Sequence, residues 1–211
     1  MGTLGWTGSL TPPNCPSRLS IVDCTVDSIA QVEANIGINK ANYYLDRSIS
    51  HKIMVSKESA QHTRTVVFDN TAQSNAWPKG TYKSFIRFYI NPESIVEKAL
   101  INGSELSRGQ IIESEENGYK VVALRVDVPI QKQLSLDLVY STPLAKDGSF
   151  SYVFYNKKQS GLNNDPFTVQ ITHSQDIKPV LVAPNATITG NTILFSSQAL
   201  DDASLFGVKF E

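Results

Sequence analysis

The chain is poor in charge and has no long hydrophobic run. Charged residues make up 18% of its 211 residues, and the net charge is −1 with a pI near 6.3. A chain with this balance lacks the strongly positive net charge that is typical of proteins that bind nucleic acid or anionic lipid. No apolar stretch approaches the roughly 20 residues that cross a bilayer. Residues 1–6 also lack the regions of a signal peptide, so we expect either a cytosolic protein or a piece of a longer one whose export signal lies upstream.

Cysteine is scarce as well. Only Cys15 and Cys24 occur, in a proline-rich stretch with little regular structure of its own. A disulfide between them would close a loop of about ten residues and contribute roughly 2–3 kcal/mol. We expect this disulfide in preference to two unpaired thiols. Two cysteines without a nearby histidine do not make a zinc site, so no structural metal is expected.

Catalytic motifs are missing. The sequence has no glycine-rich phosphate loop and no Gly-x-Ser-x-Gly elbow. Its three histidines, His51, His62 and His173, all fall in strand-like segments, and His51 and His62 can face one another across a hairpin. We interpret them as strand-face residues on a half-solvated sheet, because no further ligand or nucleophile recurs at suitable spacing. No enzymatic activity, catalytic residue or cofactor is predicted.

Acidic and amide clusters have ordinary explanations. The carboxylates Glu113, Glu115 and Glu116 precede an Asn-Gly turn and are typical of a solvated hairpin tip, not of a glycosidase pair. Three groups resemble calcium-binding loops but are better explained as turn caps: they are Asn163-Asn164-Asp165, Asp201-Asp202 and Asp69-Asn70. An isopeptide bond from Lys40 or Lys83 to an asparagine is a weaker hypothesis, since it needs a dry core.

One segment has helical spacing. Asp23 is a candidate N-cap, and apolar residues follow it at intervals of three and four as far as Ile36. Gly37 then falls where a left-handed residue ends a helix. The pattern predicts a short amphipathic helix over residues 23–37.

After Tyr43 the period changes to two, which predicts strands. The expected strands are 49–55, 62–68, 82–90, 95–101, 119–128, 134–140, 150–156, 167–173, 180–182, 186–188, 192–195 and 205–210. The breaks carry the hairpin signals Asn102-Gly103, Asn117-Gly118, Asp147-Gly148 and Gly190-Asn191. We therefore predict a mainly β fold, an antiparallel β-sandwich of Ig-like architecture with one short N-terminal helix.

Domain boundaries are weakly marked. We expect residues 1–42 to form a disulfide-pinned segment and helical cap, and residues 43–211 to form the sandwich. The strands expected within residues 180–211 are shorter and more polar than the earlier ones. They either form a small sub-sheet or complete the first sheet.

Two polar blocks, 33–44 and 75–82, combine asparagine turn chemistry with large aromatic side chains. Trp77, Tyr82, Tyr43 and Tyr44 are the candidate binding residues, because an exposed aromatic platform stacks on sugar rings. The alternative is that Trp77 and Pro78 wedge into the core while the asparagines cap the backbone, and we favour this second arrangement.

The order of these blocks resembles the C-terminal part of a family of bacterial envelope proteins, the domain of unknown function family 4012. The residues that carry the likeness are the two blocks, the segment Phe85–Pro92 and the turn Lys158-Gln159-Ser160-Gly161, with Asp201-Asp202 before a last apolar strand. The resemblance implies an exported protein with an upstream membrane anchor and no assigned catalytic residues. It also supports the disulfide, which the extracytoplasmic face permits.

The sequence thus predicts a non-enzymatic, extracellular or cell-surface module, a structural or interaction part of a larger bacterial cell-envelope protein. The alternative is a carbohydrate or envelope-polymer binding module that uses the aromatic residues near Trp77. The partner is unknown, with other envelope proteins or glycans as candidates and no nucleic acid.

Overall fold

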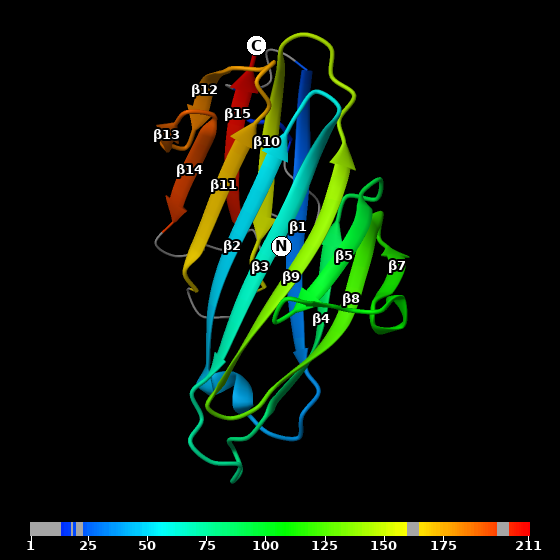
Figure 1. Ribbon diagram of the computed structural model, residues 1–211, viewed down its shortest axis with the longest axis vertical. Helices are drawn as coiled ribbons and strands as arrows, with labels where there is room; N and C mark the ends of the chain where they lie inside the picture. Colours follow the sequence, from blue (N-terminus) through cyan, green and yellow to red (C-terminus); the bar gives the residue numbers. More distant parts are fainter. Residues whose placement is uncertain (1–13, 18, 20–22, 160–164, 198–202) are drawn as a thin grey trace, which may run out of the picture.

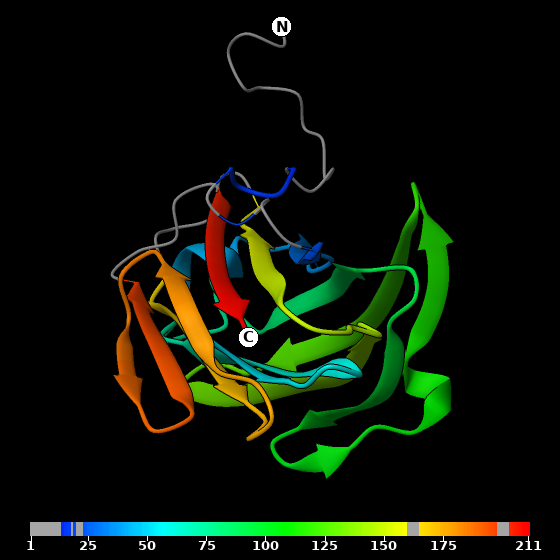
Figure 2. The same cartoon turned by 90° about the horizontal axis from the view of Figure 1, so that it is seen from above.

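The computed structural model describes residues 14–17, 19, 23–159, 165–197 and 203–211. Within them the chain forms two β-sheets packed face to face, as the view from above shows (Figure 2). Sheet A contains, in spatial order, β12 (Pro179–Ala183), β15 (Ala203–Phe210), β10 (Phe150–Lys157), β1 (Asp23–Asn35), β4 (Tyr82–Ile90), β8 (Tyr119–Val128) and β7 (Ile112–Glu116). Sheet B contains β13 (Thr187–Thr189), β14 (Thr192–Ser197), β11 (Phe167–His173), β2 (Leu45–Val55), β3 (Ser59–Asn70), β9 (Lys132–Pro143), β5 (Ile95–Ile101) and β6 (Ser104–Glu105). The predicted mainly β, sandwich-like fold is confirmed.

Alternating side chains build the core between the sheets. Along β4, the residues Tyr82, Ser84 and Ile86 are buried, while Lys83 between them is exposed, as period-two patterning requires. β2 and β3 alternate in the same way. Most of the largest fully buried side chains are aromatic: they include Phe68, Phe88, Phe150, Phe154, Phe167, Phe195 and Phe210.

The asparagine-glycine hairpins form where the sequence places them. Asn102 and Asn117 have φ values of 51°, and Gly103 and Gly118 have φ values of 78° and 79°. Two successive residues with positive φ are the geometry of a tight hairpin turn whose twist matches that of the strands. These turns join β5 to β6 and β7 to β8.

The predicted helix over residues 23–37 is wrong. Residues Asp23–Asn35 form β1, which lies at the centre of sheet A between β10 and β4. Five consecutive residues, 27–31, are buried, because one face of β1 meets sheet B and its other face is also covered. The periodicity of two is lost in such a strand, and Val26, Ile29 and Ala30 matched helical spacing by coincidence.

The sheets are mixed, which corrects the antiparallel prediction. β1 runs parallel to β10, and β2 runs parallel to β11, while the other pairs are antiparallel. Each parallel pair joins an early strand to a late one, and a hairpin cannot make such a pair. The C-terminal strands extend both large sheets: β12 and β15 join sheet A, and β13 and β14 join sheet B.

Two ends of the sandwich differ in what they carry. In Figure 1, β1 begins at the upper end, where the C-terminal residue also lies, and runs to the lower end. The lower end carries the 3₁₀ helix η2 (Ala41–Tyr44) and the connection between β3 and β4. Tyr43 and Tyr44 therefore precede the strand that begins at Leu45 and do not start it.

The predicted disulfide is present. Cys15 and Cys24 are bonded, and their Cα atoms are 6.4 Å apart. Leu19, inside the closed loop, is fully buried and contacts Gly207 of β15, where any Cβ would collide with it. The disulfide thus holds an irregular segment against sheet A. In the described part of the chain, no helix has the length and apolar content needed to span a bilayer.

Candidate functional site

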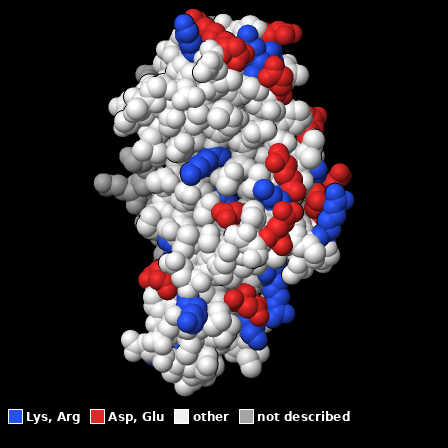
Figure 3. Space-filling model, in the orientation of Figure 1, with Lys and Arg blue, Asp and Glu red and all other residues white. Residues whose placement is uncertain are grey.

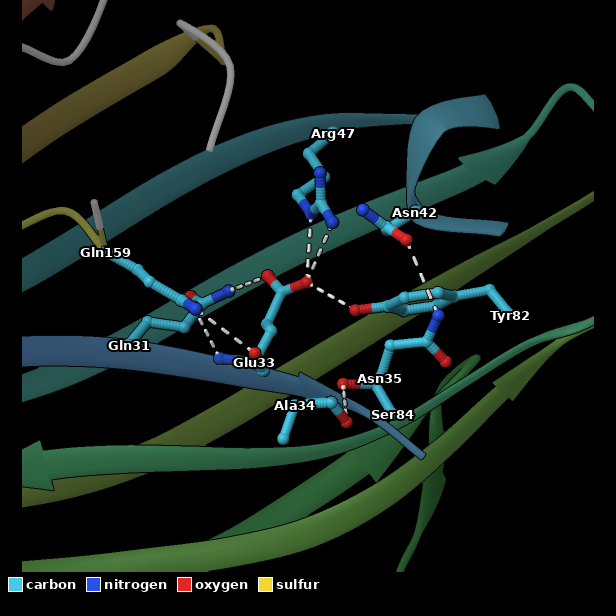
Figure 4. Close-up of polar contacts among 9 residues, drawn as sticks. All are labelled: Gln31, Glu33, Ala34, Asn35, Asn42, Arg47, Tyr82, Ser84 and Gln159. Atoms are coloured by element: carbon cyan, nitrogen blue, oxygen red, sulfur yellow. Dashed lines mark hydrogen bonds and ion pairs between the residues drawn. The ribbon is translucent and has the colours of Figure 1, made fainter. Parts of the chain in front are cut away.

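A buried carboxylate joins the two sheets near the lower end of the molecule (Figure 4). Glu33 of β1 accepts hydrogen bonds from Arg47 Nε at 3.0 Å and from the Tyr82 hydroxyl at 2.6 Å, both through Oε2. Arg47 Nη2 lies 3.0 Å from the same oxygen, and both side chains of this ion pair are 2% exposed. The ion pair is therefore buried and saturated with partners, so Tyr82 is a structural residue and not a binding residue.

The Glu33 site also brings together two of the motifs found in the sequence. The Gln159 side chain accepts a hydrogen bond from the Glu33 amide at 2.7 Å and donates one to the Glu33 carbonyl oxygen at 3.2 Å. β10 pairs with β1 only as far as Lys157, so Gln159 continues the ladder with its side chain. Gln159 thus binds the first residue of the first asparagine-rich block. The last two residues of the motif 158–161 lie outside the described residues.

An arginine lies further inside the same interface. Arg64 of β3 donates to Gln31 Oε1 at 3.0 Å and to Asn156 Oδ1 at 2.8 Å. Burial lowers the pKa of Arg64 to about 10, although Tyr140 and Glu33 act in the opposite direction. Gln31 in turn donates to Glu33 Oε1 at 2.9 Å, so the two arginines share one hydrogen-bonded network.

Two histidines form a second hydrogen-bonded cluster with Asp27, which precedes Gln31 and Glu33 on β1. His51 Nε2 lies 2.9 Å from His62 Nδ1, and His62 Nε2 lies 2.8 Å from Asp27 Oδ2. The Tyr152 hydroxyl donates to the same Asp27 oxygen at 3.1 Å. His62 stacks on Tyr140 with ring centroids 4.3 Å apart. The expected facing of His51 and His62 is confirmed, but both point into the core and not onto a half-solvated face.

We define the polar spine as three residues of β1 and four of sheet B: Asp27, Gln31, Glu33, Arg47, His51, His62 and Arg64. Every member of the spine is buried. An acid beside two histidines resembles a catalytic relay, but a relay must contact a substrate. None of these side chains reaches the surface, so the spine joins the two sheets and offers no open reaction site.

The other sequence candidates lie apart from one another. Glu113, Glu115 and Glu116 are exposed on the edge strand β7, as a solvated hairpin requires. Asn70 donates to the carbonyl oxygens of Gly80 and Val128 and caps the Ala72 amide. Within the described ranges no group of three potential metal ligands occurs; residues 163–164 and 201–202 lie outside them.

The lysines proposed for an isopeptide bond do not lie in a dry core. Lys40 and Lys83 are both exposed, whereas such a crosslink needs a buried lysine beside an asparagine and an acid. His173, the third histidine, is buried at the end of β11 and has its Nδ1 2.8 Å from the Ser174 carbonyl oxygen.

The asparagine-rich blocks meet at the lower end and form what we call the tip, residues 36–44 and 71–81. The Lys40 amide donates to the Pro78 carbonyl oxygen at 2.8 Å, which ties one segment to the other. Asn39 makes a second tie, since its Nδ2 donates to the Thr81 carbonyl oxygen at 3.0 Å. The expectation that asparagines cap these turns is confirmed by Asn35 and Asn39, whose Oδ1 atoms accept from the Gly37 and Ala41 amides.

The tip displays large apolar side chains to solvent. Ile38 is 100% exposed, Tyr43 is 75% exposed and Trp77 is 72% exposed. The favoured arrangement, with Trp77 wedged into the core, is wrong, because the ties between the two segments use backbone and asparagine groups and leave the indole outside. Tyr82, by contrast, is 1% exposed. Tyr44 is half-buried under Lys79, whose Nζ lies 5.4 Å from the ring centroid.

Sequence reasoning missed four members of this surface: Ile36, Ile38, Lys40 and Lys79. The signal that could have found Ile38 is its position between Gly37 and Asn39. An isoleucine inside a turn-forming sequence has no strand or helix face on which to be buried.

No protein-family model and no curated protein sequence matches the chain. Among solved structures, a Legionella pneumophila protein provisionally assigned to nutrient binding is similar at 7% identity and a TM-score of 0.59, over 87% of this chain and 70% of that one. Yeast LTA4 hydrolase in complex with bestatin is similar at 10% identity and a TM-score of 0.50; this chain covers only 31% of the hydrolase chain. At such identities the likeness shows a shared fold alone.

Proposed function

We propose that this chain is a non-enzymatic, extracytoplasmic interaction module of a larger bacterial cell-envelope protein and that it binds its partner through the tip. The exposure of Trp77, Tyr43 and Ile38 on tied segments carries this proposal. Exposed aromatic and aliphatic side chains gathered at one place mark binding surfaces, because removing their apolar surface from water on binding is favourable.

The proposal that the module is not an enzyme is supported by the closure of the polar spine. Each of its acids, histidines and arginines has a hydrogen-bond partner inside the sandwich. The extracytoplasmic location is supported by the disulfide between Cys15 and Cys24, since such bonds persist in oxidising compartments. Membership of the envelope family suggested by the asparagine-rich blocks is part of the same proposal.

A carbohydrate or envelope polymer is the second candidate partner. The exposed rings of Trp77 and Tyr43 favour it, because aromatic faces stack on sugar rings. Exposed amide side chains of Asn42 and Asn75 lie in the same two segments and can donate to hydroxyl groups.

Binding through the tip is tested with three probes: an array of bacterial glycans, insoluble peptidoglycan and phospholipid vesicles. The wild type is compared with Trp77→Ala/Tyr43→Ala and with a matched control, Ile112→Ala/Ile188→Ala, which removes two exposed isoleucines from edge strands. We expect at least one probe to bind the wild type and the control but not the tip variant. Equal binding by all three proteins, or no binding to any probe, would contradict the proposal.

A further inference from the structure

We infer that the partner of the tip is an anionic lipid surface, into which Ile38, Trp77 and Tyr43 insert while Lys40 and Lys79 contact the headgroups. This inference rests on the proposed function, because it names the partner of the same surface. It follows from four properties of the tip: its side chains, its charge, its internal hydrogen bonds and its position.

The exposed side chains match the layers of a membrane interface. Trp and Tyr favour the headgroup region, where a ring is buried and its polar group stays hydrated. Ile38 has no polar group to satisfy, and it is completely exposed in water. A flat sugar ring would leave this projecting isoleucine unused, whereas the acyl region of a bilayer accepts it.

The charge of the tip is of one sign. Lys40 and Lys79 are its charged residues, and residues 36–44 and 71–81 contain no Asp or Glu. Neither lysine forms an ion pair with any described residue. The nearest acids in the sequence, Asp46 and Asp69, are paired in register in β2 and β3, beyond the tip. The chain as a whole is almost neutral, but this end attracts anionic headgroups.

Part of the backbone of the tip is already hydrogen-bonded, which lowers the cost of placing an irregular loop at the lipid interface. An amide group that leaves water is stabilised when it has an internal partner. Amides with a partner inside or at the edge of the tip are those of Ile36, Gly37, Lys40, Ala41, Tyr43 and Lys79. The asparagines of the first block supply two of these acceptors. The asparagine-rich sequence thus reduces the number of tip amides that depend on water.

The position of the tip leaves it accessible to a planar surface. It lies at the lower end of the sandwich, opposite the C-terminal residue and the start of β1 (Figure 1). In the same orientation, the lowest part of the visible face carries almost no charge, and both basic and acidic residues lie above it (Figure 3). Within the described ranges, the rest of the sandwich therefore does not stand between the tip and a membrane.

Vesicle binding tests the inference in a Trp6→Phe background, where Trp77 is the only indole. Sedimentation and Trp77 emission are measured with phosphatidylglycerol–phosphatidylcholine vesicles and with phosphatidylcholine alone. We expect binding to the anionic vesicles, a blue shift of the emission and quenching by brominated lipid. Ile38→Ser should weaken partitioning by about tenfold, and Lys40→Gln/Lys79→Gln by about 25-fold on anionic vesicles only.

The control is Ile188→Ser, an exposed isoleucine of β13 far along the chain from the tip, which should bind as the wild type does. Absence of vesicle binding, or an equal loss in the control, overturns the lipid inference. If peptidoglycan or a glycan binds through Trp77 while vesicles do not, the proposed interaction function survives and only the lipid partner is wrong. If no probe binds, both proposals fail.

Discussion

Glu33 binds side chains from several parts of the chain: Gln31 of β1, Arg47 of β2, Tyr82 of β4 and Gln159. Its carboxylate forms an ion pair with Arg47 and accepts a hydrogen bond from the Tyr82 hydroxyl, and the Gln159 side chain binds its backbone. Burying a charge is tolerated only while a partner of opposite sign stays beside it. Glu33 therefore acts as a structural residue, even though a buried acid beside an arginine is also common at catalytic sites.

Replacing Glu33 with Gln should lower the free energy of unfolding by about 3–5 kcal/mol, because Arg47 keeps its charge inside the sandwich with no counter-ion. Urea unfolding measures the change. The matched control is Asp127→Asn, which breaks the exposed pair with Arg125 and should leave the unfolding midpoint nearly unchanged. An equal effect of the two substitutions would contradict the structural role of Glu33.

His51 should make the fold sensitive to acid. Burial, then the neighbouring His62 and Arg64, lower the pKa of His51 well below its ordinary value. Below about pH 6.5 the unfolded chain therefore binds a proton that the folded chain excludes, so the free energy of unfolding falls as the pH falls. Between about pH 7 and about pH 5 the loss approaches roughly 2 kcal/mol.

His51→Phe tests this pH dependence. The new ring can still stack on Phe154, whose centroid lies 4.3 Å from that of His51, but it does not titrate. The variant should be less stable at every pH, since His62 loses a partner, and its stability should change less between about pH 7 and about pH 5. Parallel stability curves for the two proteins would refute the assignment to His51.

At the scale of elements, strands with one covered face were predictable and β1 was not. In β4 the alternation of Tyr82, Lys83 and Ser84 fixes which side chains point inward. β1 is covered on both faces, and three of its inward residues are polar. Apart from the bond between Gln31 and Glu33, their partners lie more than ten residues away, in β2, β3, β4 and β10. The local sequence therefore does not distinguish this strand from an amphipathic helix.

The turns of the tip were predictable from the sequence, but the exposure of its aromatic side chains was not. Asparagine and glycine signal the bends, but they do not determine whether the aromatic side chains between them point in or out. That choice depends on contacts between two segments about 40 residues apart. Examples are the hydrogen bond from the Lys40 backbone amide to the Pro78 carbonyl oxygen and the one from the Asn39 side chain to the Thr81 carbonyl oxygen. Sequence alone therefore left Trp77 open between core and solvent.

Asn39→Ala should loosen the tip without unfolding the sandwich. The substitution removes the bonds to the Thr81 carbonyl oxygen and the Ala41 amide, a loss of about 1–2 kcal/mol. Hydrogen exchange at the Lys40 amide should become faster, because the bond of that amide to Pro78 depends on the same tie. The control is Asn75→Ala, which removes the side chain of an exposed asparagine of the same tip and should leave the exchange rate unchanged. Equal acceleration in both variants would show that the Asn39 side chain does not hold the two segments together.

At the scale of the whole molecule, two parallel strand pairs join early and late parts of the chain. β1 and β2 each lie beside a strand from the last third of the sequence. The sandwich therefore closes only when the chain is nearly complete, and the polar spine fixes how the sheets face one another. This leaves the tip as a rigidly held end that displays Trp77, Tyr43 and Ile38 away from the C-terminal residue.

The most direct measurement is iodide and acrylamide quenching of Trp77 fluorescence in the Trp6→Phe protein, free in solution. Both proposed partners require this indole in water on a folded tip. We predict an emission maximum typical of a hydrated indole and quenching close to that of a free tryptophan side chain, with Asn39→Ala little different. A blue-shifted emission that resists both quenchers would place Trp77 in the core and contradict binding through the tip.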